Sequence, residues 1–267
     1  MTGELLLITG LGGEIGQSLS QEFNRRKQGF LRLEDYFSAE YKDIKPKRLI
    51  HLAGYADESN PQKLINANID YLKKVIDNLS NTSVEEVIFF SSATVYGNQN
   101  KEDVSEEDAL ISPGLYGCSK LVGEQLLANS NLRSLCLRLP GVLELRNSTT
   151  FLSKTFTKVR TGSDICIYNG SKIYNNFISV PILADFIINS KLYKQHDIIN
   201  LASKKELTLF EIVNLLKKNL SSPSNIVEFS DETDFFNLSI NKSIEKYKFF
   251  PGISEDTLVS WCKSRVF

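Results

Sequence analysis

The sequence has few of the residues that build metal and disulfide sites. It contains two histidines and four cysteines in 267 residues, and no two cysteines form a C-x-x-C pair. Such widely spaced cysteines argue against a zinc site and fit reduced, mostly buried thiols. Two imidazoles are also too few for the usual histidine-based centres. We therefore expect no metal site.

The chain also has no large excess of charge of one sign and no long apolar runs. The formal net charge is −1, so the chain lacks the basic footprint of a nucleic-acid-binding protein. No apolar run approaches the ~20 residues of a membrane-spanning helix. The run 5–8 is too short for a signal-peptide core and has no basic leader. We expect a cytoplasmic protein without a membrane partner.

The chain does contain the alternating strand and helix patterns of an α/β protein. Hydrophobic residues make up 42% and charged residues 24% of the sequence, which is typical of a globular fold. Short apolar segments alternate with amphipathic ones, in the order expected for a doubly wound parallel sheet, a Rossmann fold. Strands are predicted at 4–8, 29–35, 47–54, 85–92 and 134–142, and helices at 14–27, 62–78 and 115–129.

The second half of the chain follows a different pattern. We expect helices at 151–160, 180–189, 208–219 and 254–265, and strands at 164–168, 177–180 and 197–201, the first two around an Asn-Gly turn. The predicted domains are a dinucleotide-binding domain of residues 1–147, to which 179–202 return, and a small substrate-binding lobe of 148–178 and 203–267. The stretch 35–47 is too short for a further strand and helix, so the sheet should be shortened there.

A glycine-rich loop joins the first strand to the first helix. The segment 9–16 reads TGLGGEIG, and a strand, a glycine loop and a helix in this order are the context of a dinucleotide fingerprint. Gly10 would permit the tight turn, Gly13 would let backbone N–H groups approach a diphosphate, and Gly16 would allow close helix packing. The helix N-terminus would face the phosphates.

The second strand carries a signal for the choice of dinucleotide. Glu34 lies 18 residues after Gly16, about where an acidic residue binds the adenosine ribose hydroxyls. A carboxylate at this position favours NAD, because it repels a 2′-phosphate. Arg32 leaves NADP possible if its side chain points out of the strand end. Glu34 could equally be an ordinary surface charge.

Tyr116 and Lys120 are four residues apart in the segment LYGCSKLVGE. On a helix this spacing places both side chains on one face. A nearby cation lowers the pKa of a phenol, which is about 10 when unperturbed. The pair is therefore a candidate acid/base for interconverting an alcohol and a carbonyl. Ser92 ends a predicted strand, where a hydroxyl is well placed to hold a substrate oxygen. Asn68, inside a predicted helix, is either a solvated polar residue or a support for the active site.

Several ordered motifs give the chain a family likeness. They are TGLGGEIG (9–16), HLAG (51–54), SNP (59–61), SSATVYG (91–97), YGCSK (116–120) and LRLPGV (137–142). In this order they resemble the extended short-chain dehydrogenase/reductases, the NAD-dependent epimerase/dehydratase group, which includes sugar-nucleotide epimerases and 4-keto reductases.

The resemblance implies roles for particular residues. Tyr116 would be the acid/base, Lys120 would bind the nicotinamide ribose and lower the pKa of Tyr116, and Ser92 would hydrogen-bond the reacting oxygen. The implied cofactor-binding residues are Gly10, Gly12, Gly13, Glu14, Ile15, Gly16, Glu34, Leu52, Ala53, Gly54, Asn68, Tyr116 and Lys120. The implied substrate-binding residues are Ser92, Ala93, Thr94 and Asn175. Relatives often form homodimers through helices like 62–78 and 115–129.

The sequence also departs from the family pattern. Dehydratases of the family carry an Asp-Glu pair where this chain has Ala93-Thr94, so elimination of water is not expected. Many members that act on nucleotide sugars have an Asn in place of Gly141 and an Arg in place of Asn175. Loss of that Arg removes a bidentate partner for a diphosphate.

Three functions remain open from the sequence. The first is an oxidoreductase that acts on a nucleotide-linked sugar, either a C4 epimerase or a 4-keto reductase; the motif SSATVYG favours the epimerase, whereas the short chain and the missing Arg favour the reductase. The second is a reductase of a non-nucleotide carbonyl compound. The third is a catalytically silent NAD(P)-binding sensor, which would not need the set of Ser92, Tyr116 and Lys120.

Overall fold

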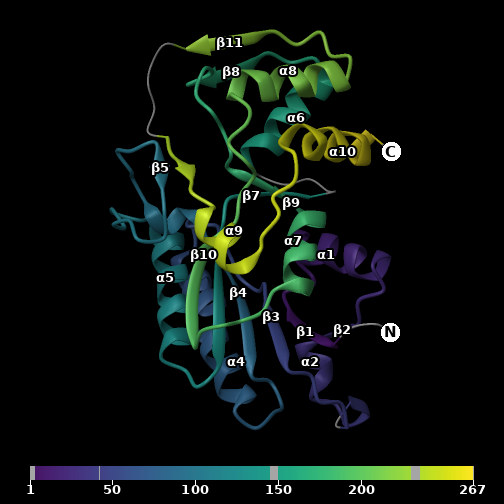
Figure 1. Ribbon diagram of the computed structural model, residues 1–267, viewed down its shortest axis with the longest axis vertical. Helices are drawn as coiled ribbons and strands as arrows, with labels where there is room; N and C mark the ends of the chain where they lie inside the picture. The colour runs from purple at the N-terminus through teal and green to yellow at the C-terminus, as the bar shows by residue number, and fades with distance from the viewer. Residues whose placement is uncertain (1–3, 42, 145–149, 230–234, 267) are drawn as a thin grey trace.

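A computed structural model describes residues 4–41, 43–144, 150–229 and 235–266. Its centre is a parallel sheet of six strands in the order β10-β6-β4-β3-β1-β2. The strands are β1 (Leu6–Thr9), β2 (Phe30–Arg32), β3 (Arg48–His51), β4 (Glu86–Ser92), β6 (Arg133–Leu139) and β10 (His196–Asn200). In Figure 1 this sheet occupies the lower half of the molecule, with helices on both faces. The prediction of a doubly wound parallel sheet is confirmed.

The two faces of the sheet are covered by different helices. On one face Leu19 and Phe23 of α1 (Glu14–Arg25) join Leu183 and Phe186 of α7 (Val180–Asn189) in one hydrophobic core. The second core lies on the other face. Its helices are α2 (Leu33–Tyr36), α4 (Tyr71–Leu79) and α5 (Leu115–Ala128). Strands β1 and β3 are buried along their whole length, as expected for strands covered on both sides.

The order of the strands determines where a ligand can bind. From β1 the chain crosses to β2 on one side and then to β3 on the other. Where the direction of winding reverses in this way, a crevice opens outside the carboxyl ends of the strands. Here these are the ends of β1 at Thr9 and of β3 at His51. Both segments that follow were predicted to bind the cofactor.

The sheet is short on its β2 side, as predicted. Between β2 and β3 the described chain forms only α2 and a 3₁₀ turn, η1 (Ala39–Tyr41), and no additional strand. One boundary differs from the prediction: β2 ends at Arg32, so Glu34 lies in the first turn of α2 and not on a strand. The acidic residues of the segment sit at a helix N-terminus, where negative charge is favoured.

The long helix predicted over 62–78 is continuous but irregular. It consists of α3 (Pro61–Ile65), a π-helical turn, η2 (Asn66–Asp70), and α4. Such π-turns are rare and often occur at functional sites. This one contains Asn68.

The strand predicted over 134–142 is split at Pro140. Proline cannot donate a hydrogen bond to a sheet, so β6 ends at Leu139 and β7 (Gly141–Leu143) pairs instead with β9 (Phe177–Ser179). The strands predicted around the Asn-Gly turn are present, but they do not pair with each other. β8 (Ile165–Tyr168) pairs in parallel with β11 (Ile226–Phe229).

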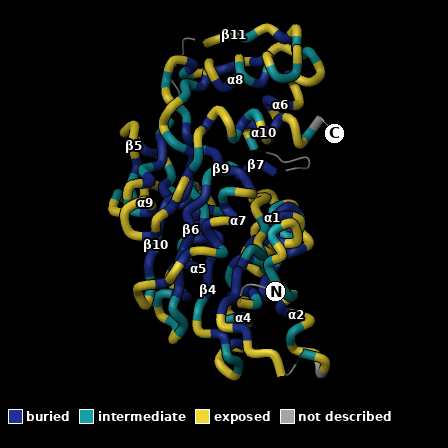
Figure 2. The backbone as a smooth tube through the Cα atoms, turned by 45° about the vertical axis from the view of Figure 1, so that its right-hand side comes forward, coloured by how far each residue is buried: buried dark blue, intermediate teal, exposed yellow. Residues whose placement is uncertain are grey.

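A separate hydrophobic core lies above the sheet. Its helices are α6 (Phe151–Thr161), α8 (Leu209–Asn219) and α10 (Ser254–Val266). Figure 2 shows buried residues both here and in the sheet region. The division into domains with the boundaries given above stays a prediction, although β10 does complete the main sheet.

The remaining elements connect the two regions and were not predicted. They are η3 (Ala93–Tyr96), β5 (Asp103–Val104), β12 (Asn237–Leu238) and α9 (Asn241–Tyr247). The short strands β5 and β12 pair with each other. Among the described residues, no helix is long and apolar enough to cross a membrane.

Candidate active site

Two glycines hold the loop after β1 close to its neighbours. Gly10 has a φ of +76°, and a Cβ atom there would lie 2.5 Å from the backbone nitrogen of Ala53. A Cβ on Gly16 would lie 2.3 Å from the carbonyl oxygen of Gly10. Neither contact is possible for a residue with a side chain, so both positions require glycine.

The first turn of α1 presents free backbone amides. Its N-cap is Gly13, which provides no side-chain cap, and the space around a Cβ on Gly12 is open to 4 Å. Uncapped N–H groups at the start of a twelve-residue helix favour an anion. The loop therefore suits the diphosphate of a dinucleotide, and the cofactor role of Gly12, Glu14 and Ile15 stays a prediction.

The end of β3 is tied to the end of β1. The hydroxyl of Thr9 lies 3.0 Å from Nδ1 of His51 and accepts a hydrogen bond from the Ala53 amide at 3.3 Å. Burial lowers the pKa of His51 to about 3, so this imidazole is neutral. These contacts place Leu52, Ala53 and Gly54 beside the glycine loop.

Asn68 is buried and fully engaged rather than solvated. Its amide accepts from the backbone nitrogen of Tyr55 at 2.7 Å and donates to the Tyr55 carbonyl at 2.9 Å. It also donates to the hydroxyl of Ser119, on α5, at 2.8 Å. Asn68 therefore joins the loop after β3 to the helix that carries Tyr116 and Lys120.

Lys120 is buried in the middle of these elements. Its Nζ lies 5.7 Å from the centre of the Tyr116 ring and 5.0 Å from that of Phe89. A Cβ on Gly54 would approach this Nζ to 3.1 Å, so the glycine leaves room for the ammonium group. Burial lowers the pKa of Lys120 from 10.5 to about 8.

The acidity of Tyr116 differs from the sequence-based expectation. Burial raises the pKa of the phenol above its usual value of 10, and a hydrogen bond with the Ser92 side chain only partly offsets this effect. Lys120 was expected to lower this pKa. In the structure desolvation of the phenol is the largest influence, and the influence that lowers the pKa is the hydrogen bond with Ser92.

Ser92 ends β4 and faces the same space as Tyr116. Its hydroxyl oxygen accepts hydrogen bonds from the Thr94 amide at 3.2 Å and from the Thr94 hydroxyl at 3.0 Å. Ser92, Ala93, Thr94 and Tyr116 line one cleft of about 690 Å³. The structure thus brings the predicted acid/base, its hydroxyl partner and two predicted substrate residues together.

One part of the cleft lining, called here the aromatic wall, consists of aromatic side chains. Tyr174, Phe177 and Phe236 line it, and the Tyr174 ring stacks on Phe177 with centroids 6.5 Å apart. None of the described residues that line the cleft is an Asp, Glu, Lys, Arg or His. The described lining of the cleft therefore consists of uncharged polar groups, small residues, aliphatic side chains and aromatic rings.

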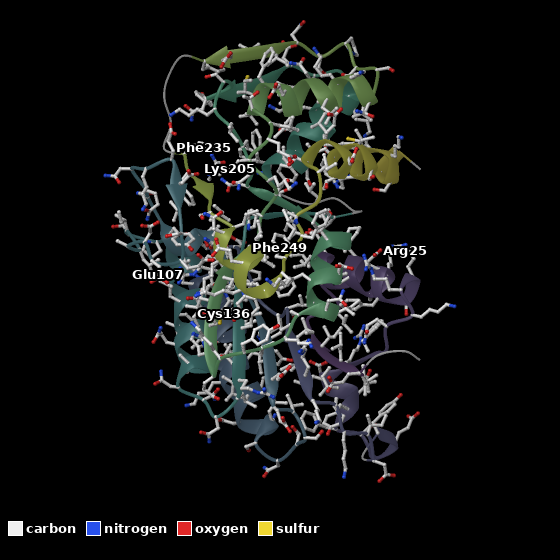
Figure 3. The ribbon with its side chains drawn as sticks, viewed as in Figure 1. Arg25, Glu107, Cys136, Lys205, Phe235 and Phe249 are labelled. Atoms are coloured by element: carbon white, nitrogen blue, oxygen red, sulfur yellow. The ribbon has the colours of Figure 1, made fainter. Side chains whose placement is uncertain are left out.

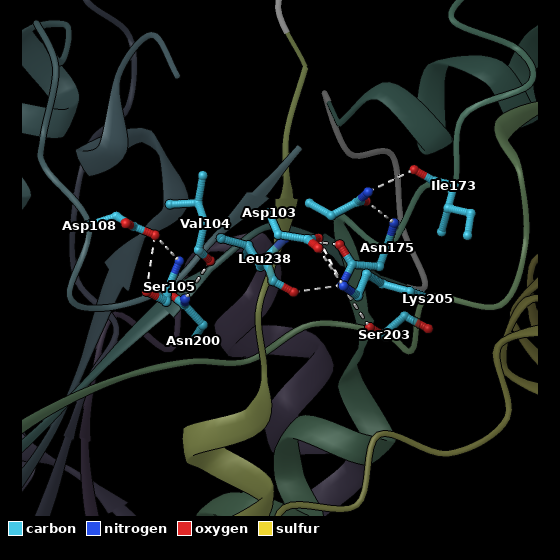
Figure 4. Close-up of polar contacts among 11 residues, drawn as sticks. Asp103, Val104, Ser105, Asp108, Ile173, Asn175, Asn200, Ser203, Lys205 and Leu238 are labelled. Atoms are coloured by element: carbon cyan, nitrogen blue, oxygen red, sulfur yellow. Dashed lines mark hydrogen bonds and ion pairs between the residues drawn. The ribbon is translucent and has the colours of Figure 1, made fainter. Parts of the chain in front are cut away.

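Asn175, predicted to bind the substrate, does not line the cleft. It is completely buried, and its side chain donates to the carbonyls of Ser203 and Leu238 and accepts from the Leu238 amide. Figure 4 shows these contacts. The neighbouring Asn176 lines the cleft instead. Adjacent residues of an extended chain point to opposite sides, so only one of the two asparagines faces the cleft, and it is not the predicted one.

The aromatic wall was missed by the sequence reasoning. Its members come from distant segments around β9 and before β12. Figure 3 labels Phe235, the neighbour of the lining residue Phe236, where this region meets the lower half of the molecule. The Phe235 ring stacks on Tyr174 at 5.7 Å. The only sequence signal was the Phe235-Phe236 pair, which is equally compatible with a hydrophobic core.

A buried carboxyl near the glycine loop was also missed. Glu144, at the end of β7, faces Glu14, and its Oε2 is buried without a hydrogen-bond partner. Burial and the proximity of Glu14 raise the pKa of Glu144 to about 7. A carboxyl in this environment is partly protonated at neutral pH, which reduces repulsion between the two groups.

A second cavity of similar volume lies between α1, α7 and α10. It is lined by Arg25, Ile182 and Trp261 among others, and it contains neither Ser92 nor Tyr116. The cleft at Tyr116 is the stronger candidate because it alone, of these two, joins the predicted acid/base to the ends of the parallel strands.

The chain is similar in sequence to a known protein family and to two curated proteins. A family model described as the NAD dependent epimerase/dehydratase family matches residues 6–202. Among curated proteins, dTDP-4-dehydro-6-deoxyglucose reductase of Escherichia coli is 25% identical over 234 residues, or 80% of this chain and 72% of that protein. An uncharacterized protein of Methanocaldococcus jannaschii is 25% identical over 192 residues, and the match spans 67% of this chain but only 59% of that protein.

Solved structures share the fold over nearly the whole chain. RMD from Pseudomonas aeruginosa, complexed with NADPH, has a TM-score of 0.80 at 18% identity and covers 98% of both chains. UDP-glucuronic acid 4-epimerase from Bacillus cereus, in complex with NAD, has a TM-score of 0.76 at 17% identity, with 98% of this chain and 100% of that chain covered.

Proposed function

The chain belongs to the NAD dependent epimerase/dehydratase family, and from this we propose that it transfers hydride to or from a carbon of a nucleotide-linked sugar, as a C4 epimerase or a 4-keto reductase. As a family member it is an NAD-dependent enzyme of the extended short-chain dehydrogenase type. The observation that carries the proposal is the convergence of Ser92 and Tyr116 in the cleft, with the buried ammonium of Lys120 5.7 Å from the centre of the Tyr116 ring.

In the proposed reaction Tyr116 is the group that accepts and donates the proton. When the sugar carbon is oxidised, the phenolate of Tyr116 removes the hydroxyl proton; when a ketone is reduced, the phenol returns it. Ser92 holds the reacting oxygen, and Lys120 provides positive charge that stabilises the phenolate. A bound nicotinamide supplies the hydride acceptor or donor. Ala93 and Thr94 are not carboxylic acids, so elimination of water lacks its acid and base.

The cofactor would extend from the glycine loop towards Lys120. Gly10, Gly12, Gly13 and Gly16 would shape its diphosphate site, with the backbone of Glu14 and Ile15. The backbone of 52–54 and the side chain of Asn68 would line its path to the cleft. Either NAD or NADP suits this arrangement, since Arg32 and Glu34 are both exposed at the end of β2.

The choice between the two dinucleotides gives a testable expectation. The Glu34 carboxylate accepts a hydrogen bond from the Tyr71 hydroxyl at 2.6 Å, which holds it in place near the end of β2. We expect Glu34→Ala to weaken NAD binding more than NADP binding, because it removes a ribose acceptor and a source of repulsion towards a 2′-phosphate. Titration calorimetry measures both affinities. Arg32→Ala is the matched control; should the Arg32 variant show the larger change in the ratio of affinities, Arg32 determines the cofactor.

The identity of the substrate can be tested with a panel of compounds. We expect one of the UDP-, dTDP-, GDP- or CDP-sugars, added with NAD(H) or NADP(H), to raise the melting temperature above that with cofactor alone. The same compound should then be converted. A reductase consumes one reduced cofactor per turnover, whereas an epimerase consumes none. Stabilisation by cofactor alone, with no response to any nucleotide sugar, would contradict the sugar assignment.

One observation favours a second candidate, a reductase of a non-nucleotide carbonyl compound. A nucleotide diphosphate needs cationic partners, and no described lining residue of the cleft is cationic. The aromatic wall would suit an uncharged substrate. The panel separates the candidates, because this one predicts activity with simple ketones and no competition from free UDP.

We also propose that the protein forms a homodimer through α4 and α5. The groove between these helices is lined by Ile76, Leu121, Val122 and Leu126, and Val122 is 40% exposed. Pairing of two copies would cover these apolar side chains in a four-helix interface.

A further inference from the structure

The helix that carries Tyr116 lacks a cap of its own. α5 begins at Leu115, and its N-cap residue, Gly114, has no side chain to accept a hydrogen bond from the first turn. The first amides of a helix have no partner within the helix. Tyr116 lies in this first turn, so its position depends on what else binds these amides.

Glu58 binds the amide of Tyr116 from a distant part of the chain. Its Oε1 accepts a hydrogen bond from the Tyr116 backbone nitrogen at 2.7 Å. A Cβ on Gly114 would lie 2.9 Å from the same oxygen, so the glycine that removes the local cap also makes room for this one. A carboxylate at a helix N-terminus gains both a charge-assisted hydrogen bond and a favourable interaction with the helix dipole.

The loop that contains Glu58 is itself held at both ends. Asn68 binds the backbone of Tyr55 on one side. On the other side the Asn60 side chain accepts from the Lys63 amide at 3.0 Å and caps α3. Asp57, next to Glu58, bonds within the loop, to the Ser59 amide and the Tyr55 hydroxyl. Glu58 is therefore the member of this loop whose carboxylate reaches α5.

We propose that Glu58 is a positioning residue: its carboxylate fixes the first turn of α5 and so holds the Tyr116 phenol against Ser92 in the cleft. The proposal rests on the proposed function, in which Tyr116 is the acid/base. Glu58 takes no part in proton transfer. A displacement of the reacting groups by ~1 Å can lower turnover ~10²-fold, so the loss of one cap is enough to affect catalysis.

The test compares Glu58→Ala and Glu58→Gln with Asp57→Ala, the matched control from the same loop. The first readout needs no substrate. In protein labelled with ¹³C at tyrosine Cζ, and with Tyr116→Phe to assign the signal, the Tyr116 phenol should titrate above the usual value of about 10 in the unmodified protein. In Glu58→Ala this pKa should fall towards 10, because the first turn loosens and admits water. The glutamine variant keeps the acceptor oxygen and should retain the raised pKa, as should Asp57→Ala.

The second readout is turnover with the most active compound of the panel above. We expect Glu58→Ala to lower kcat ~10- to 100-fold with KM and cofactor affinity changed less than about threefold, and Glu58→Gln to recover most of the loss. An unchanged Tyr116 titration in Glu58→Ala overturns the proposal, and so does an equal change in Asp57→Ala. If Glu58→Ala does not fold, the test depends on Glu58→Gln. This variant keeps the acceptor oxygen, so a lowered Tyr116 pKa in it contradicts the proposal. Full turnover in Tyr116→Phe would instead refute the proposed function, whatever Glu58 does.

Discussion

Replacement of Tyr116 by phenylalanine is expected to lower turnover by at least about two orders of magnitude, the usual scale for loss of a general acid/base. The variant keeps the ring and its distance of 5.7 Å from the Lys120 ammonium, and removes only the hydroxyl that hydrogen-bonds with Ser92. Cofactor affinity should change little, because the glycine loop and Asn68 are untouched. Steady-state turnover and calorimetric titration with NAD measure the two effects.

Tyr55→Phe is a suitable control for this experiment. Its hydroxyl bonds to Asp57 at 3.2 Å, and Tyr55 is not among the lining residues of the cleft. The control should therefore keep its turnover. A Tyr116→Phe variant as active as the control would remove Tyr116 from the mechanism and leave a dinucleotide-binding fold without an identified acid/base.

The second large effect concerns Lys120, for which activity and stability should change in opposite directions. Lys120→Met should lose turnover ~10²-fold or more and bind cofactor more weakly, because the cation beside Tyr116 is gone. The same variant should be more stable than the unmodified protein at neutral pH. Burial of the ammonium lowers the pKa of Lys120 from 10.5 to about 8, which corresponds to a cost of roughly 3 kcal/mol at neutral pH.

The pH dependence of stability provides a separate check. Between the folded pKa of about 8 and the unfolded value of 10.5, the unfolded chain binds more protons at Lys120 than the folded one. The free energy of unfolding therefore gains a contribution that rises with pH across this window. Lys120→Met lacks this contribution. Urea unfolding without cofactor, near neutral pH and near pH ~9.5, measures it.

The matched control is Lys63→Met, which removes an exposed lysine whose ammonium lies 4.2 Å from the centre of the Tyr55 ring. Its stability should change little at either pH, since exposed charges contribute little. A Lys120→Met variant that is clearly less stable at neutral pH would show that packing of the lysine side chain outweighs the cost of burying its charge.

The residues named in these predictions differ in how clearly the sequence pointed to them. The glycine loop, Ser92, Tyr116 and Lys120 could be singled out because each belongs to a short local pattern: a turn after an apolar strand, a hydroxyl at a strand end, a pair four residues apart. Their roles stay predictions. Asn175 was misplaced because two adjacent asparagines gave no indication of which one faces the cleft. Glu58 carried no local signal, since its partner lies 58 residues away.

The pKa of Tyr116 shows a further difference between sequence and structure. Spacing along the helix correctly placed an ammonium near the phenol. It said nothing of the apolar surroundings, and these raise the phenol pKa more than the hydrogen bond with Ser92 lowers it. Desolvation depends on every group around a side chain, so it could not be inferred from residues 116 and 120 alone.

The sequence by itself determined the order of most strands and helices, the glycine turn and the residues proposed as the acid/base set, because these depend on periodicity and on conformational limits within a few residues. Only the tertiary structure decided that the described residues lining the cleft are uncharged and partly aromatic, that Asn176 rather than Asn175 faces it, and that Glu58 caps the helix of Tyr116. The cleft and the Glu58 cap each join segments far apart in the chain, so their contacts arise only when these segments pack together in the folded protein.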